Sequence, residues 1–211
     1  MSPSTPTAAC RSEECLVACA LDGAAFELRP GTTREVRLAT PEDKARVMDT
    51  LFGLRPVRPG ELSLFGRDAA DLAPDERLAL NRRLAAVFAE GGLISNLKVW
   101  ENLVLPACWA SRTGPSPFEA EALELFDDLG LDADLAGRLP SRLTCFERKA
   151  IAFVRGLLTH PDAMVFDSVL EHLSEEERRR AARFEELFRA RCMRGAILRI
   201  EVAHARAGHH A

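Results

Sequence analysis

The stretch GTTREVRLATPEDKARVMDTLFGL, at positions 31–54, limits the possible folds of this chain more than any other. Val36 and Leu38 indicate a strand, and the apolar spacing from Ala45 to Leu54 indicates an amphipathic helix. Further strand-like runs alternate with helical ones along the rest of the sequence. Strands that alternate with helices predict a largely parallel sheet in an α/β core.

A strand followed closely by a helix is also the setting of a phosphate-binding loop, G-x-x-x-x-G-K-[ST], whose glycines let backbone amides surround phosphate. With Lys44 as the motif lysine, the glycine positions hold Leu38 and Asp43, and the metal-binding hydroxyl position holds Ala45. The junction Thr40-Pro41-Glu42-Asp43 supplies a helix cap, a proline at the first helical position and two carboxylates. A helix N-terminus attracts anions, and this one already carries the carboxylates of Glu42 and Asp43. We therefore expect the site to be closed to ATP.

The remaining helices and strands follow from periodicity and from helix caps. We expect helices at 77–86, 118–129 and 146–158, a capping box at 174–177 that opens a long charged helix, and a last strand at 196–200. On the charged helix, Glu176 and Arg180 are spaced to pair at i,i+4.

Six segments in this order resemble the motifs of ABC-transporter ATP-binding subunits. They are the strand and turn Phe26–Gly31, the hairpin Arg58–Gly66, a Q-loop-like Val87–Leu93, a signature-like Leu143–Arg148, the helix end Arg155–Pro161 and a Walker B-like Ala163–Asp167. The resemblance runs from about Leu21 to Val202. It implies a P-loop NTPase (RecA-like) ABC ATPase core with a small antiparallel β part and a helical subdomain.

The same resemblance suggests how the chain is divided. We expect a disordered N-terminus at 1–15, a single ABC ATPase-like domain at 16–205 with its helical subdomain at about 93–158, and a tail at 206–211. The segment Gly91–Leu97 with Trp100-Glu101-Asn102 is similar to ATPases that serve lipid-trafficking permeases of the Mla/Mce type.

Position by position, the resemblance implies that catalytic groups have been lost. The Q-loop glutamine corresponds to Ala89 and the two signature glycines to Cys145 and Phe146, whose side chains would fill the space that γ-phosphate needs. The general-base position is occupied by Ser168 and the D-loop aspartate position by Ser174. We therefore expect no catalytic residue.

Two motif residues remain, Lys44 and Asp167. The resemblance implies vestigial contacts to nucleotide phosphate and metal, whereas the simpler interpretation is a structural lysine in a first helical turn and an aspartate at a strand end. The switch-histidine position falls near Glu201 or Val202, and His204 comes too late for that role.

These losses predict a catalytically degenerate subunit homologue that serves as a structural or regulatory partner of an ABC transporter, with lipid transport as one candidate role. We expect no cofactor, with ATP and Mg bound only if the closed-site interpretation is wrong. One alternative is a divergent ATPase that still hydrolyses ATP, so enzyme activity stays open. Another is a stand-alone interaction protein that uses the former nucleotide cleft.

The implied partners are an ABC permease subunit, an intact ABC ATPase subunit, or both. Candidate docking residues after the Q-loop are Glu90, Leu93, Ile94 and Trp100. The net charge of −4 argues against nucleic acid as a partner, and no apolar run is long enough for membrane insertion. Without an N-terminal signal sequence, we expect a cytoplasmic protein held at the inner face of the membrane through a permease.

A metal site is not expected either. Cys10, Cys15 and Cys19 lie close together in sequence, but their spacing matches no zinc pattern and no histidine is near.

Overall fold

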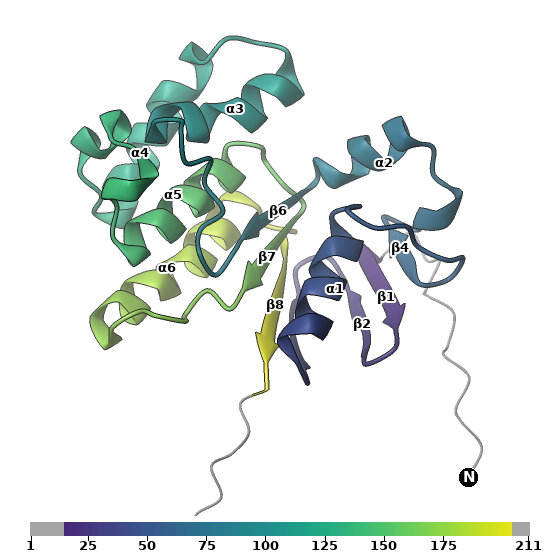
Figure 1. Ribbon diagram of the computed structural model, residues 1–211. Coiled ribbons are helices and arrows are strands. Elements are labelled where there is room, and N and C mark those ends of the chain that lie inside the picture. Colours follow the sequence, from purple (N-terminus) through teal and green to yellow (C-terminus); the bar gives the residue numbers. More distant parts are fainter. Residues whose placement is uncertain (1–14, 204–211) are drawn as a thin grey trace, which may run out of the picture.

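The computed structural model describes residues 15–203, which form two four-stranded sheets with helices packed around them (Figure 1). Cys10, most of the expected N-terminal segment, His204 and the tail at 206–211 lie outside the described residues.

The smaller sheet is antiparallel and is built from the N-terminal part of the chain. Its strands are β1 (Val17–Leu21), β2 (Ala24–Leu28), β4 (Leu62–Leu64) and β5 (Arg67–Asp68), in the order β2-β1-β4-β5. In β2 alternate side chains are buried and exposed, as expected for a strand with one solvated face.

The larger sheet is parallel, as strands alternating with helices predict. Its strands are β3 (Thr33–Leu38), β6 (Leu84–Val87), β7 (Ala163–Asp167) and β8 (Ala196–Val202), in the order β3-β8-β7-β6. Every residue of β7 is buried, because neighbouring strands and helices cover this central strand.

Six α-helices accompany the sheets within the part of the chain that the structure describes. They are α1 (Pro41–Leu51), α2 (Pro74–Asn81), α3 (Val99–Ser111), α4 (Glu119–Leu129), α5 (Cys145–Leu157) and α6 (Glu175–Arg191). Short 3-10 turns lie between these elements, at Ala69–Asp71, Ser116–Phe118, Ala133–Gly137 and Pro140–Arg142. Figure 1 shows α3 to α6 gathered on one side of the parallel sheet and α1 with the antiparallel sheet on the other.

The buried apolar residues fall into two clusters. One joins α3, α4, α5 and α6 to the parallel sheet, and its centre holds the stacked rings of Phe153 and Phe184, 4.7 Å apart. The other joins α1 to both sheets through residues such as Val47 and Leu62. The larger sheet is therefore covered on both faces, as expected for the α/β core that the sequence predicts.

Two details differ from the predictions. The helix expected at 77–86 ends at Asn81, and residues 84–87 form β6 instead. A short apolar run such as Leu-Ala-Ala-Val fits a buried strand as well as a helix, so periodicity could not separate them. On α6, Arg180 does not pair with Glu176 in the described residues. It donates to the carbonyl oxygens of Leu129 and Gly130 and lies over the ring of Phe146.

Within residues 15–203, every helix is too short or too polar to cross a bilayer.

Candidate functional site

The candidate site lies where β3, β8 and β7 end side by side. Because these strands are parallel neighbours, their carboxyl ends meet at one edge of the sheet. Ligands of open α/β sheets bind outside this edge. The edge carries Asp167, the last residue of β7, and receives Lys44 from the first turns of α1.

Lys44 and Asp167 contact each other directly. The Lys44 ammonium lies 2.8 Å from Asp167 Oδ1, and the two side chains are only 16% and 11% exposed. Lys44 Nζ also donates to Ser168 Oγ at 3.0 Å. Ser168 itself is fully buried and has a φ of +45°, a left-handed backbone conformation that non-glycine residues rarely adopt. Three sequence-predicted positions thus meet at one point.

The connection between β3 and α1 is too short for a phosphate-binding loop. β3 ends at Leu38 and α1 begins at Pro41, so only Ala39 and Thr40 join them. Pro41 has no N–H to offer, and the amide of Asp43 is bound by Thr40 Oγ1 at 3.1 Å. This junction therefore does not supply the ring of backbone amides with which a P-loop surrounds phosphate.

Asp43, at the second glycine position, has its carboxylate fully engaged. One oxygen accepts a hydrogen bond from Thr40 Oγ1 at 2.9 Å, and the other pairs with Arg46 Nη2 at 2.7 Å. The neighbouring Ala45 is exposed on α1 and has no hydroxyl with which to bind a metal. No group of three or more His, Cys, Asp or Glu within the described residues is arranged to hold a metal ion.

Further acidic side chains interact electrostatically with the groups of the ion pair. Burial raises the pKa of Glu201, on β8, and the carboxylates of Glu171 and Asp167 raise it further, whereas Lys44 lowers it. Lys44 is therefore the cation that balances a cluster of carboxylates at this edge.

The signature-like segment forms the start of α5. Backbone amides at this helix N-terminus donate hydrogen bonds to side chains of the segment itself. Thr144 Oγ1 accepts from the Glu147 amide at 3.1 Å, and Glu147 Oε2 accepts from the Thr144 amide at 2.7 Å. This is a capping box, which places a carboxylate at the helix end that would otherwise attract an anion. The spacing Thr-x-x-Glu at Thr144 and Glu147 is the sequence signal for this capping box, which was not among the predicted helix starts.

Phe146 is not placed as the resemblance implied. It is 1% exposed and stacks on Phe184, with ring centroids 6.0 Å apart, so its side chain lies in the core and does not fill a phosphate site. Cys145 is half-buried at the first position of α5. Phe146 at this helix start therefore contributes to the core.

Lys149 is a further residue that sequence analysis did not single out. It is fully buried, and its ammonium donates to the carbonyl oxygens of Val169 and Glu171 in the loop that follows β7. Burial lowers the pKa of Lys149. This side chain fixes the loop on which Ser168 lies. Its sequence signal was weak, because a lysine on a helix is usually solvated.

The remaining predicted positions lie apart from the ion pair. Leu38 is a buried residue at the end of β3, Ala89 lies half-buried in the turn after β6, and Ser174 caps α6 by accepting from the Glu177 amide. The structure therefore brings Lys44, Asp167 and Ser168 together, and it does not add Ala89 or Ser174 to them.

Three of the docking candidates lie on the segment between β6 and α3, and Trp100 lies in the first turn of α3. Glu90 and Ile94 are exposed, whereas Leu93 and Trp100 pack against the core. Asn102 holds the segment, because its Oδ1 accepts from the Ile94 amide at 2.7 Å and its Nδ2 donates to three carbonyl oxygens. The exposed apolar side chain of Ile94 is thus presented on fixed backbone.

Curated relatives resemble most of the chain. It is 31% identical over 156 residues to the lipoprotein-releasing system ATP-binding protein LolD of Novosphingobium aromaticivorans, covering 74% of this chain and 69% of that protein. It is 29% identical over 150 residues to the glutamate/aspartate import ATP-binding protein GltL of Escherichia coli K12. The chain spans 61% of GltL and 47% of the methionine import ATP-binding protein MetN of Caulobacter vibrioides. No family model matches the chain.

Solved structures share the fold. The dimeric structure of MJ0796, a bacterial ABC transporter cassette, superposes with a TM-score of 0.71 at 18% identity and covers 84% of this chain and 78% of that one. A second MJ0796 structure, in a post-hydrolysis state bound to ADP and Pi, gives a TM-score of 0.68 at 19% identity over 86% of this chain and 78% of that one.

These comparisons overturn one prediction. The expectation that no cofactor is bound is wrong for proteins of this kind, because the relatives are named ATP-binding proteins and a neighbour of the same fold is bound to ADP and Pi. Identity and coverage against LolD, together with the shared fold, place the chain among these proteins. The chain therefore belongs to the ATP-binding subunits of ABC transporters.

Proposed function

We propose that this chain is a catalytically degenerate member of its family that acts as a structural or regulatory partner in an ABC transporter. The observation that carries the proposal is the ion pair between Lys44 and Asp167, 2.8 Å apart and mostly buried. The two motif residues that remain are bound to each other. Lys44 would have to leave Asp167 before it could contact a phosphate, and Asp167 would lose its cation.

Hydrolysis also needs a group that positions or activates the attacking water. Ser168 stands at that position, and its buried hydroxyl accepts a hydrogen bond from Lys44. A serine hydroxyl held in this way is a poor base at neutral pH. The α5 N-terminus, capped by Glu147, offers no free anion site to a second subunit.

The proposal concerns hydrolysis rather than binding. ATP is the ligand to test, because the relatives are named for it. A nucleotide bound here would lack the amides of a phosphate loop and would depend on other contacts. Lipid transport stays a candidate role, on the resemblance of residues 91–102 and on a relative named for lipoprotein release.

We expect the purified chain to show no Mg-ATP turnover above the protein-free background, and Lys44→Ala to leave that result unchanged. Phosphate release measured at millimolar Mg-ATP tests this. Lys98→Ala is the matched control, because Lys98 is exposed. Binding of Mg-ATP without turnover would agree with the proposal. Turnover that disappears in Lys44→Ala but persists in Lys98→Ala would establish the divergent ATPase instead.

A partner role predicts that the segment around Ile94 contacts a permease subunit. Ile94 is 44% exposed, and its backbone is held by Asn102, so Ile94→Asp should remove an apolar contact without unfolding the chain. Affinity capture of the tagged chain from its host membranes, followed by mass spectrometry, should recover a permease subunit with the wild type and lose it with Ile94→Asp.

The matched control for that capture is Leu123→Asp on α4, where Leu123 is 51% exposed. This variant should retain the permease. If the wild type recovers no membrane subunit, or if both variants lose it equally, the docking part of the proposal is wrong.

A further inference from the structure

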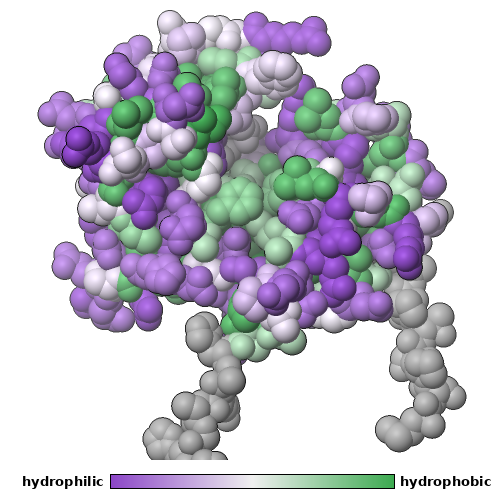
Figure 2. Space-filling model, in the orientation of Figure 1, coloured by the Kyte–Doolittle hydropathy of each residue, from purple (hydrophilic) through white to green (hydrophobic). Residues whose placement is uncertain are grey.

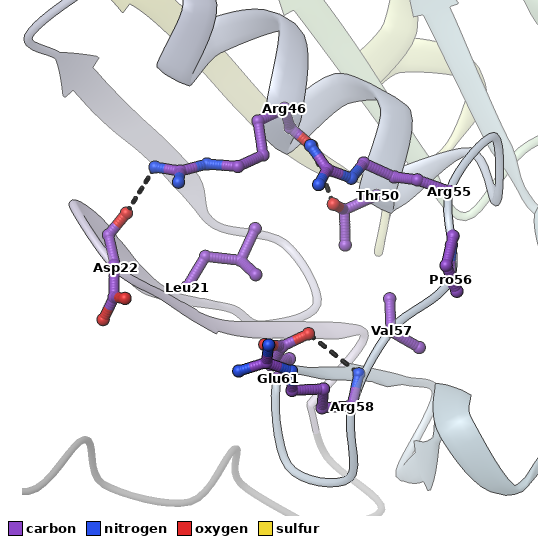
Figure 3. A pocket seen from close by; sticks show the side chains of 9 residues that line it. All are labelled: Leu21, Asp22, Arg46, Thr50, Arg55, Pro56, Val57, Arg58 and Glu61. Carbon is purple, nitrogen blue, oxygen red and sulfur yellow. Dashed lines mark hydrogen bonds between the residues drawn. The ribbon is translucent and has the colours of Figure 1, made fainter.

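A cavity of about 380 Å³ lies between α1, the turn that joins β1 to β2, and the loop at 55–61 (Figure 3). Thr50, in the last turn of α1, lines it, whereas Lys44 and Asp167 do not. The cavity is therefore separate from the edge of the parallel sheet described above. Its volume is at the lower end of the range for small-molecule sites, which fits a metabolite of modest size.

Three arginines line the cavity, and one of them is already engaged. Arg46 Nη2 donates to the Asp22 carbonyl oxygen at 2.8 Å and pairs with Asp43 at 2.7 Å. This bond spans the cavity from α1 to the β1–β2 turn (Figure 3). Arg55 and Arg58 differ, because neither guanidinium forms an ion pair within residues 15–203.

Two carboxylates line the same cavity. Figure 3 shows Arg46 and Arg55 on the α1 side of the cavity, and Asp22, Glu61 and Arg58, drawn beside Glu61, away from that side. Glu61 Oε2 accepts the backbone amide of Arg58 at 2.8 Å, which fixes its position, and neither carboxylate has a cation partner among the described residues. With Arg46 balanced by Asp43, the cavity wall presents two unpaired positive and two unpaired negative groups.

We infer that this cavity binds a small zwitterion of the α-amino acid class. Its carboxylate would lie at the unpaired Arg55 guanidinium on the α1 side, which matches carboxylate geometry, and its ammonium at the carboxylates away from that side. Leu21 and Val57, which also line the cavity, would contact an apolar side chain.

The charge pattern argues against simpler ligands. A phosphate ester or pyrophosphate would gain from Arg55 and Arg58 but would meet Asp22 and Glu61 with like charge. A polyamine would gain from Asp22 and Glu61 but would meet Arg55 and Arg58 with like charge. A molecule that carries both charges a few ångströms apart satisfies both sets of groups.

Calorimetric titration of the full chain with L-leucine tests the inference. Two probes each remove one charged group of leucine: 4-methylpentanoate lacks the ammonium and isopentylamine lacks the carboxylate. A third probe, pyrophosphate, is an anion without an ammonium or an apolar side chain. We expect leucine to bind, and each probe to bind about tenfold more weakly or not at all. Arg55→Gln and Asp22→Asn should each weaken leucine binding by about tenfold, since each removes one charge-assisted contact.

The matched control is Arg82→Gln, because Arg82 is exposed and does not line the cavity. It should bind leucine within about twofold of the wild type. The inference is overturned if leucine does not bind at concentrations on the order of 10 mM, or if 4-methylpentanoate or pyrophosphate binds as tightly as leucine. These outcomes do not depend on ATP turnover, because neither substitution touches Lys44 or Asp167.

Discussion

Lys44→Met is expected to lower the free energy of unfolding by about 3 kcal/mol. The substitution keeps the length of the side chain but removes the ammonium, leaving Asp167 as an unpaired, mostly buried carboxylate at 11% exposure. Loss of one partner of a buried ion pair costs about 3–5 kcal/mol, and the remaining solvent access places this pair at the lower end. Urea denaturation of the two proteins measures the difference.

The double variant Lys44→Met/Asp167→Asn separates charge from packing. Because it removes the stranded charge as well, it should regain most of the lost stability. Lys98→Met is the control, and with an exposed lysine it should stay within about 0.5 kcal/mol of the wild type. If Lys44→Met is as stable as the wild type, Lys44 is free for a ligand and the structural interpretation of the ion pair fails.

Phe184→Ala is expected to destabilise the protein by about 3–5 kcal/mol. Phe184 is fully buried on α6, and its ring stacks on Phe153 at 4.7 Å and on Phe146 at 6.0 Å. Removing it leaves a cavity between α5 and α6, so the cost combines lost burial with lost contacts. Because Phe146 lies in the signature-like start of α5, that segment should lose protection from hydrogen exchange first.

The control for Phe184→Ala is Leu123→Ala, an apolar truncation at a side chain that is 51% exposed. It should change the free energy of unfolding by less than about 1 kcal/mol, which chemical denaturation can measure. A loss in Phe184→Ala no larger than in Leu123→Ala would mean that the α5–α6 contact is not part of the stable core.

Much of the fold could be predicted from the sequence. The alternation of strands and helices, the Thr40–Pro41 helix start and the capping box at Ser174 all act within a few residues of chain, and each is present in the structure. The prediction failed at Leu84–Val87, where a short apolar run forms a buried strand. This strand, β6, pairs with β7, which is about 80 residues further along the chain, and local periodicity cannot predict pairing between such distant segments.

The sequence by itself determined which chemical groups stand at these positions, because Ala45 has no hydroxyl, Ala89 no side-chain amide and Ser168 no carboxylate, whatever the fold. Only the tertiary structure decided what the remaining groups do. Lys44 and Asp167 are more than 120 positions apart, and they meet because β3, β8 and β7 end at one edge. Phe146 lies in the core because burying its ring against Phe184 is lower in free energy than leaving it exposed at the start of a helix. This contact too joins residues that are distant in sequence. Distant contacts depend on packing, and packing is a property of the whole chain.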